Sequence, residues 1–167
     1  MDIIHYSILF KSAMVNCNIS KWSHCNILYV LYAENSNSQK CIEYVRYKDV
    51  FKYEQYLSNV VIPKFRKALT CLRLSSHDLL IEKGRHINLP RHERLCTYCD
   101  LEEIEDEFHF TLKCPFSSEI RQKYLPDFYV TNCSHFNFYK LMSETSDSVL
   151  MNNLARFTYY SFQKGKL

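Results

Sequence analysis

Three cysteines and one histidine constrain this chain more than any other feature. They follow the spacing Cys-x2-Cys-x9-His-x4-Cys, at Cys96, Cys99, His109 and Cys114. A Cys-x2-Cys turn can present two sulfurs to one ion, and a later pair completes the tetrahedral shell that Zn²⁺ prefers. All four positions are protein ligands, so none is left for a catalytic water. The spacing therefore predicts one structural zinc ion; the alternative is that the four are unrelated buried residues.

The remaining cysteines carry no comparable pattern. The eight cysteines are irregularly spaced, which favours a reducing compartment over a disulfide framework. Those outside the motif are expected to be small buried apolar residues. They are Cys17, Cys25, Cys41, Cys71 and Cys133.

Other metal or catalytic interpretations of the cysteines and histidines are weaker. Cys17 and Cys25 could form a second site with His5 and His24, and His77 or His86 could add a ligand, but lone histidines more often make surface hydrogen bonds. A redox dithiol at Cys96 and Cys99 would need a helix amino terminus near a βαβ unit. A protease dyad of His109 with Cys99 or Cys114 would need an oxyanion-forming glycine turn. Neither context is visible in the sequence.

Periodicity and composition predict a mainly α fold, a small helical domain around the zinc site. The 167 residues include only 2 glycines and 4 prolines, too few for a many-turned β fold. We expect Pro63 to open a helix with Phe65, Ala68, Leu69 and Leu72 on one stripe. We expect a second helix to be capped by Ser75 or Ser76 and to end at a left-handed Gly84. Further helices are predicted over residues 105–113, 116–124 and 148–164.

Two domains are expected. A polar, turn-forming cluster at residues 34–39 separates a segment of uncertain order, residues 1–38, from a helical zinc-binding domain, residues 39–167. The zinc knuckle occupies about residues 86–125 of that domain. The five-residue step from His109 to Cys114 turns about 500° in a regular α-helix, so Cys114 should lie at or past the end of its helix.

Charge is segregated along the chain. Residues 64–94 contain eight basic and three acidic side chains, and residues 100–107 contain six acids and no base. The basic segment could be a phosphate-binding surface or an ordinary solvated helix face. The candidate phosphate contacts are Arg73, Lys83, Arg85 and Arg91.

Each candidate has a structural alternative. Arg85 could bind helix-terminal carbonyls. Arg91 or Arg94 could pair with Glu105 or Asp106 and so clamp the knuckle, and for Arg94 we favour this structural role. Tyr98, between the two thiols, is a candidate for stacking on an unpaired base. Two further aromatics, Phe108 and Phe110, are expected to build a small core beside the metal.

Short segments around the motif resemble one known family in their order. They are Arg73-Leu74-Ser75-Ser76-His77, Ile81-Glu82-Lys83-Gly84-Arg85, Asn88-Leu89-Pro90-Arg91, Glu93-Arg94-Leu95-Cys96 and Ile104-Glu105-Asp106-Glu107-Phe108-His109-Phe110 with Cys114-Pro115. This pattern is similar to the carboxy-terminal zinc-binding region of reverse-transcriptase polyproteins of LINE-type (non-LTR) retrotransposons. The resemblance is strong over about residues 65–125. It implies that the four motif residues bind zinc and that the module assists nucleic-acid binding beside a polymerase.

The expected function is therefore a non-catalytic zinc module that binds RNA or single-stranded DNA. Its possible partners include a reverse-transcriptase domain, although no reverse-transcriptase or endonuclease signature is present. The alternatives are a protein-interaction module, favoured by the 13 tyrosines and 11 phenylalanines, and a non-functional element remnant. No stretch approaches a membrane span, and the start lacks a signal-peptide pattern, so an intracellular location, nuclear or cytoplasmic, is expected.

Overall fold

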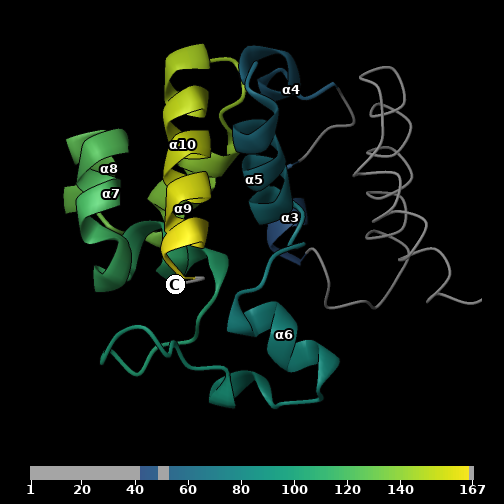
Figure 1. The fold of residues 1–167 in the computed structure, drawn as a ribbon, viewed down its shortest axis with the longest axis vertical. Coiled ribbons are helices and arrows are strands. Elements are labelled where there is room, and N and C mark those ends of the chain that lie inside the picture. Colours follow the sequence, from purple (N-terminus) through teal and green to yellow (C-terminus); the bar gives the residue numbers. More distant parts are fainter. Residues whose placement is uncertain (1–41, 49–52, 166–167) are drawn as a thin grey trace, which may run out of the picture. The chain divides into compact units, whose positions relative to one another are not determined.

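The computed structural model describes residues 42–48 and 53–165 (Figure 1). Its contacts divide the chain into two units between Tyr53 and Glu54, and each is considered by itself. The first unit contributes the described helix α3 (Ile42–Tyr47). The predicted segment 1–38 and the candidate second metal site lie outside the described residues. The boundary predicted at residue 38 therefore stays a prediction.

The described part of the second unit, residues 54–165, is helical, which confirms the mainly α prediction. Its α-helices are α4 (Tyr56–Asn59), α5 (Pro63–Arg73), α6 (Leu80–His86), α7 (Ser118–Tyr124), α8 (Asp127–Thr131), α9 (His135–Ser143) and α10 (Ser148–Lys164). Shorter turns are two 3₁₀ segments, Arg91–Glu93 and Pro115–Ser117, and a π-helix, His109–Lys113. A single antiparallel bridge, Leu95 to Ile104, is the β-pairing within these residues. None of the described helices combines the length and apolar character that a membrane span requires.

The central element is α10, which packs against α4, α5 and α7 (Figure 1). It begins where the Asp147 carboxylate accepts a hydrogen bond from the Leu150 N–H (2.9 Å), a standard amino-terminal cap. Leu154 and Phe157 are fully buried, but Tyr160 is 39% exposed. Burial of this face against three neighbours makes α10 the core of the unit, and its carboxyl end points towards the knuckle.

Helix α5 begins at Pro63 as predicted, and its whole predicted stripe is buried. Its carboxyl end is formed by the two serines that were expected to cap the next helix. Ser75 takes a left-handed conformation (φ 46°), while the N–H groups of Ser75 and Ser76 donate to the carbonyls of Leu72 and Cys71. This is a Schellman ending. The prediction that Ser75 or Ser76 caps the following helix is therefore wrong, because both residues close the preceding one.

Gly84 lies inside α6 and not at its end, contrary to prediction. The left-handed position after α6 is Asn88 (φ 56°), and the Leu89 N–H donates to the Gly84 carbonyl (2.8 Å). Gly84 is required for another reason: a β-carbon there would lie 2.7 Å from Cγ and 2.8 Å from Cδ of the Arg94 side chain. The glycine lets the buried Arg94 side chain cross the helix.

We predict that Gly84→Ala destabilises the protein although alanine is the better helix former. The intrinsic gain is about 1 kcal/mol, but the displaced Arg94 side chain should cost about 1–3 kcal/mol. Urea unfolding of the zinc-loaded protein measures the balance. Gly165→Ala is a suitable control, because its β-carbon would meet nothing closer than 3.4 Å. A Gly84→Ala protein more stable than the parent would contradict the close approach of Arg94.

Candidate metal centre

The four predicted ligands converge on one point. Their ligand atoms all lie within 4.8 Å of one another. The two sulfurs of Cys96 and Cys114 are 3.8 Å apart, and Cys99 Sγ is 3.3 Å from His109 Nε2. A tetrahedral zinc ion with ordinary bond lengths has S–S edges of about 3.8 Å and S–N edges of about 3.6 Å. The separations fit this geometry, and the residues therefore suit one tetrahedral metal ion.

The first pair of ligands is held by a short hairpin-like loop. Around the Leu95–Ile104 bridge, the Cys96 N–H donates to the Glu103 carbonyl and the Glu105 N–H donates to the Arg94 carbonyl, both at 2.8 Å. These bonds fix the loop that carries Cys99.

The second pair sits on one helical turn of unusual width. The Asp106 carboxylate accepts a hydrogen bond from the His109 N–H (2.9 Å), so the helix begins at residue 107 and not at 105 as predicted. The Cys114 N–H then donates to the His109 carbonyl (2.7 Å). This i to i+5 bond defines a π-turn, a feature frequent at functional sites. Cys114 lies just past the helix end, as expected, and the wide turn brings it over His109.

A carboxylate orients the histidine. Glu103 Oε2 lies 3.1 Å from His109 Nδ1, so the ring directs Nε2 towards the sulfurs. Lys113 donates to the other oxygen of Glu103, and this hydrogen bond is the main cause that lowers the Glu103 pKa. Metal-ligating histidines commonly carry such a carboxylate on their second nitrogen. The surroundings of His109 thus resemble those of an authentic metal ligand.

Burial disfavours free thiolates at this position. Desolvation, with Cys114 nearby, raises the pKa of the Cys96 thiol to about 12, and burial also raises the pKa of Cys114. The thiols need a cation to become thiolates at neutral pH, and metal coordination supplies one. The donor set of three sulfurs and one imidazole matches structural Zn²⁺.

Arg121 on α7 supports the end of the π-turn. Its buried guanidinium donates to the carbonyls of Thr111 (2.7 Å), Cys114 (2.8 Å) and Phe110 (3.3 Å). These carbonyls have no regular helical partner once the turn ends. Arg121 therefore fixes the backbone that carries the last ligand.

Helix α6 is joined to the knuckle by Glu105 and Arg94. Glu105 Oε2 accepts from the Leu80 N–H (2.7 Å) and so caps α6, a role the sequence analysis missed. Arg94 donates to the carbonyls of Ile81 (2.9 Å) and Leu89 (2.8 Å). The clamp expected of Arg94 is present, but its partners are backbone carbonyls and not the predicted carboxylates.

The predicted phosphate contacts fall into different environments. Arg73 is 1% exposed and donates to Glu54 Oε2 (3.2 Å) and to the Met142 carbonyl, so it supports the core and is withdrawn as a phosphate contact. Arg85 is partly buried and pairs with Glu82 (2.9 Å). Lys83 is exposed.

Arg91 and Tyr98 are accessible but not isolated. The Arg91 side chain is 54% exposed and lies 3.7 Å from Asp106, one of the carboxylates considered for it. Tyr98 is 43% exposed; its ring centroid lies 4.8 Å from that of Phe116, and its hydroxyl donates to the Gly165 carbonyl (3.0 Å). Packing occupies part of the ring, so Tyr98 tethers the knuckle to the end of α10.

Phe108 and Phe110 flank His109 and are both buried, but their ring partners belong to α9 and α10. Phe108 stacks on His135 of α9, with ring centroids 3.9 Å apart, and Phe110 stacks on Phe162 of α10, with centroids 4.9 Å apart. The considered extra ligand His77 instead bonds Glu107 (3.0 Å), away from the cluster.

His86, the other considered ligand, is exposed and also lies outside the cluster. Cys71 and Cys133 are only partly buried, contrary to expectation.

Comparisons with protein-family models, with curated proteins and with solved structures found no match to this chain.

Proposed function

We propose that the chain is a non-catalytic module stabilised by one zinc ion bound to Cys96, Cys99, His109 and Cys114. The convergence of these four ligand atoms within 4.8 Å is the observation that carries the proposal. Four protein ligands complete a tetrahedral shell and leave no position for substrate or water, which is the pattern of structural zinc. Bound zinc would neutralise the charge of two thiolates and lock the loop of residues 96–103 to the π-turn.

The proposed role of this module is to bind RNA or single-stranded DNA, beside a reverse-transcriptase domain inside the cell. The proposal is supported by the excess of basic residues over 64–94 and by the resemblance to retrotransposon polyproteins. Four basic side chains of this segment are exposed to solvent: Lys64, Lys67, Lys83 and Arg91. Attachment through phosphates would be largely independent of base sequence.

Salt dependence tests this function. With four phosphate contacts, log affinity for a single strand should fall with log salt at a slope of about −3, a roughly 50-fold loss between 50 and 200 mM salt. Unrelated RNA sequences of equal length should bind with similar affinity. Fluorescence anisotropy with zinc-loaded protein measures both quantities. Binding that is absent, or that does not respond to salt, would contradict the proposal and favour the alternative of a protein-interaction module.

A further inference from the structure

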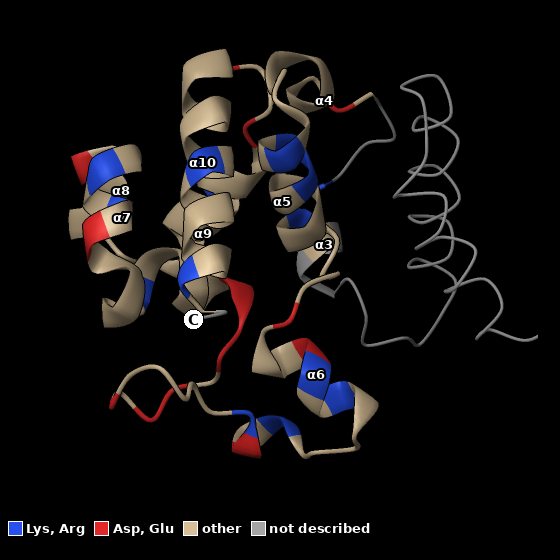
Figure 2. Cartoon of the chain, viewed as in Figure 1, with Lys and Arg blue, Asp and Glu red and all other residues tan. Residues whose placement is uncertain are grey.

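Two neighbouring helices of the second unit contain no acidic residue. The sequences of α5 and α10 include Lys and Arg but no Asp or Glu. In Figure 2 the two helices are accordingly blue and tan, whereas red segments lie in the connections, around the knuckle and on α6, α7 and α8. The helices pack against each other along their length. Their joint surface therefore carries positive charge that no acid on either helix offsets.

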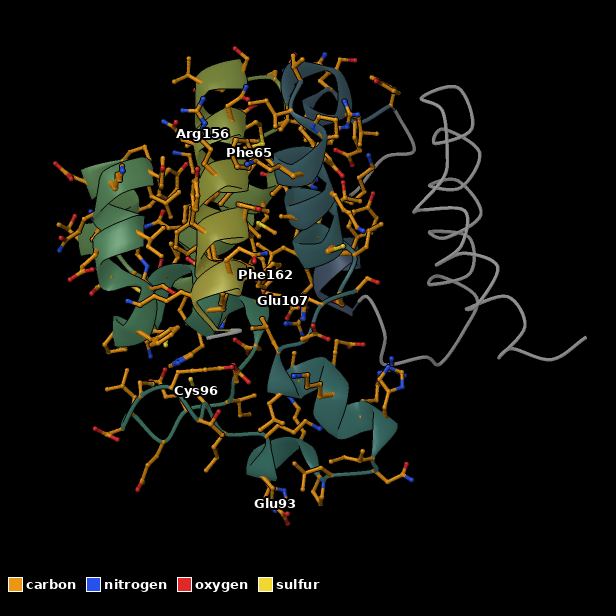
Figure 3. The ribbon with its side chains drawn as sticks, in the orientation of Figure 1. Phe65, Glu93, Cys96, Glu107, Arg156 and Phe162 are labelled. Atoms are coloured by element: carbon orange, nitrogen blue, oxygen red, sulfur yellow. The ribbon has the colours of Figure 1, made fainter. Side chains whose placement is uncertain are left out.

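One cation from each helix lies beside the same aromatic ring. The Lys64 ammonium lies 5.1 Å, and the Arg156 guanidinium 5.9 Å, from the centroid of the Phe65 ring. Phe65 and Arg156 are labelled next to each other in Figure 3, between α10 and α5. Lys64 also lies 5.0 Å from the ring centroid of Tyr159 on α10. Residues 92 positions apart thus form one basic and aromatic face.

Three of these cations are available to a ligand. Lys64, Lys67 and Arg156 are exposed, and none of them forms an ion pair within residues 42–48 and 53–165. Arg85 and Arg91, by contrast, each face a carboxylate. Binding a phosphate at the three unpaired cations requires no internal ion pair to break.

Aromatic rings border the same face. Tyr160 is 39% exposed, and its ring is nearly parallel (9°) to that of Tyr124 on α7, with centroids 5.8 Å apart. Tyr159 and Phe65 adjoin it, with ring centroids 5.3 and 5.8 Å from that of Tyr160. A rigid exposed ring of this kind offers a stacking surface to a base.

The face leads into a cavity of about 370 Å³ between α5, the start of α6 with Lys83, the end of α10 and the knuckle. Lys64, Lys67 and Tyr159 belong to both, and Tyr98 lines the cavity from the knuckle side. Two acids, Asp78 and Glu105, also line it, and the Glu105 carboxylate is engaged by the Leu80 N–H. Near Tyr124, two exposed acids flank the far side of this face: Glu119 on α7 and Asp127 at the start of α8. The positive charge is therefore concentrated at the α5–α10 end of this surface.

We propose that the α5–α10 face, defined by Lys64, Lys67, Arg156 and Tyr160, is the surface that binds an unpaired nucleic-acid strand. The inference rests on the proposed nucleic-acid function and places its main contact away from α6 and Arg91. The three cations contact phosphates, and the Tyr160 ring stacks on a base. A base inside a duplex cannot reach the ring, so the surface prefers single strands.

Two variants that each lose three positive charges test where the nucleic-acid strand binds. The helix variant is Lys64→Gln, Lys67→Gln and Arg156→Gln; the control variant Lys83→Gln, Arg85→Gln and Arg91→Gln removes the same charge. With zinc-loaded full chain and 20-nucleotide oligo(U) or oligo(dT), the helix variant should flatten the salt slope by about 2, near 0.7 per lost contact. The control variant should change it less. An equal or larger effect of the control variant would overturn the inference while leaving the nucleic-acid function intact.

Substitutions of Tyr160 test the preference for single strands separately. Tyr160→Leu should weaken oligo(U) binding roughly 5- to 150-fold, as expected for one lost stacking contact. It should change binding to a hairpin duplex little, and Tyr160→Phe, which keeps the ring, should bind like the parent. Thermal melting and zinc content, unchanged in each variant, establish that folding is intact. Equal parent affinity for single and double strands would overturn the proposed preference, and absence of all nucleic-acid binding by the parent would instead reject the function itself.

Discussion

Removing the metal from the zinc-loaded protein should unfold at least residues 86–125. A structural zinc site of this type contributes about 10–16 kcal/mol in isolated fingers, which equals or exceeds the roughly 5–15 kcal/mol that stabilises a typical domain. Without the ion, the thiols of Cys96 and Cys114 would be buried and neutral. The loop of Cys99 would then be linked to the π-turn by the weaker hydrogen bonds of Glu103 to His109 and Lys113. Circular dichroism and thermal melting before and after exhaustive chelation measure the effect.

Substitution of one ligand should reproduce chelation. Cys99→Ser replaces a thiolate with a hydroxyl that binds zinc poorly, so the variant should be purified with less than one zinc per chain and should melt at lower temperature. Cys133→Ser is the matched control, because Cys133 is a free, partly buried thiol outside the cluster. A parent that contains no zinc and melts identically after chelation would end the metal proposal.

The local geometry of the knuckle was largely predictable because ligand spacing constrains it directly. Cys96 and Cys99 must share a turn, and the step from His109 to Cys114 excludes a regular helix. The sequence could not specify that the solution is a π-turn, since that depends on the Asp106 cap and on Arg121 reaching over from α7. Pro63 also marks the start of α5, and the predicted range 148–164 matches α10.

The incorrect predictions concern residues whose contacts come from parts of the chain distant in sequence. Arg73 looks like a surface cation on a basic helix, but Glu54 and the carbonyl of Met142 make it a core residue. Gly84 looks like a helix terminator, but it provides clearance for Arg94. Helix α9 was not predicted, although Phe138, Leu141 and Met142 are fully buried. Its start is marked by the Ser134 cap, and a lone serine is a weak signal in the sequence. In each case tertiary packing decides a role that local pattern leaves open.

Arg121→Met should destabilise the zinc-loaded protein by about 3 kcal/mol. Hydrogen bonds from a charged donor are worth about 1.5–3 kcal/mol each, and buried carbonyls left without donors add a desolvation cost. Methionine fills a similar volume but donates to none of the carbonyls of Phe110, Thr111 and Cys114. Urea unfolding at fixed zinc concentration measures the loss.

Two further variants separate the hydrogen bonds of Arg121 from its charge. Lys123→Met removes one positive charge from an exposed position of the same helix and should change stability by no more than about 0.5 kcal/mol. Arg121→Lys keeps the charge but loses the planar fork that reaches several carbonyls at once, so it should lie closer to Arg121→Met than to the parent. If Arg121→Lys were instead as stable as the parent, Arg121 would act through its positive charge near the thiolates and not through its hydrogen bonds. Because the Cys114 carbonyl is among its acceptors, Arg121→Met should also weaken zinc retention against a competing chelator, which links α7 directly to the metal centre.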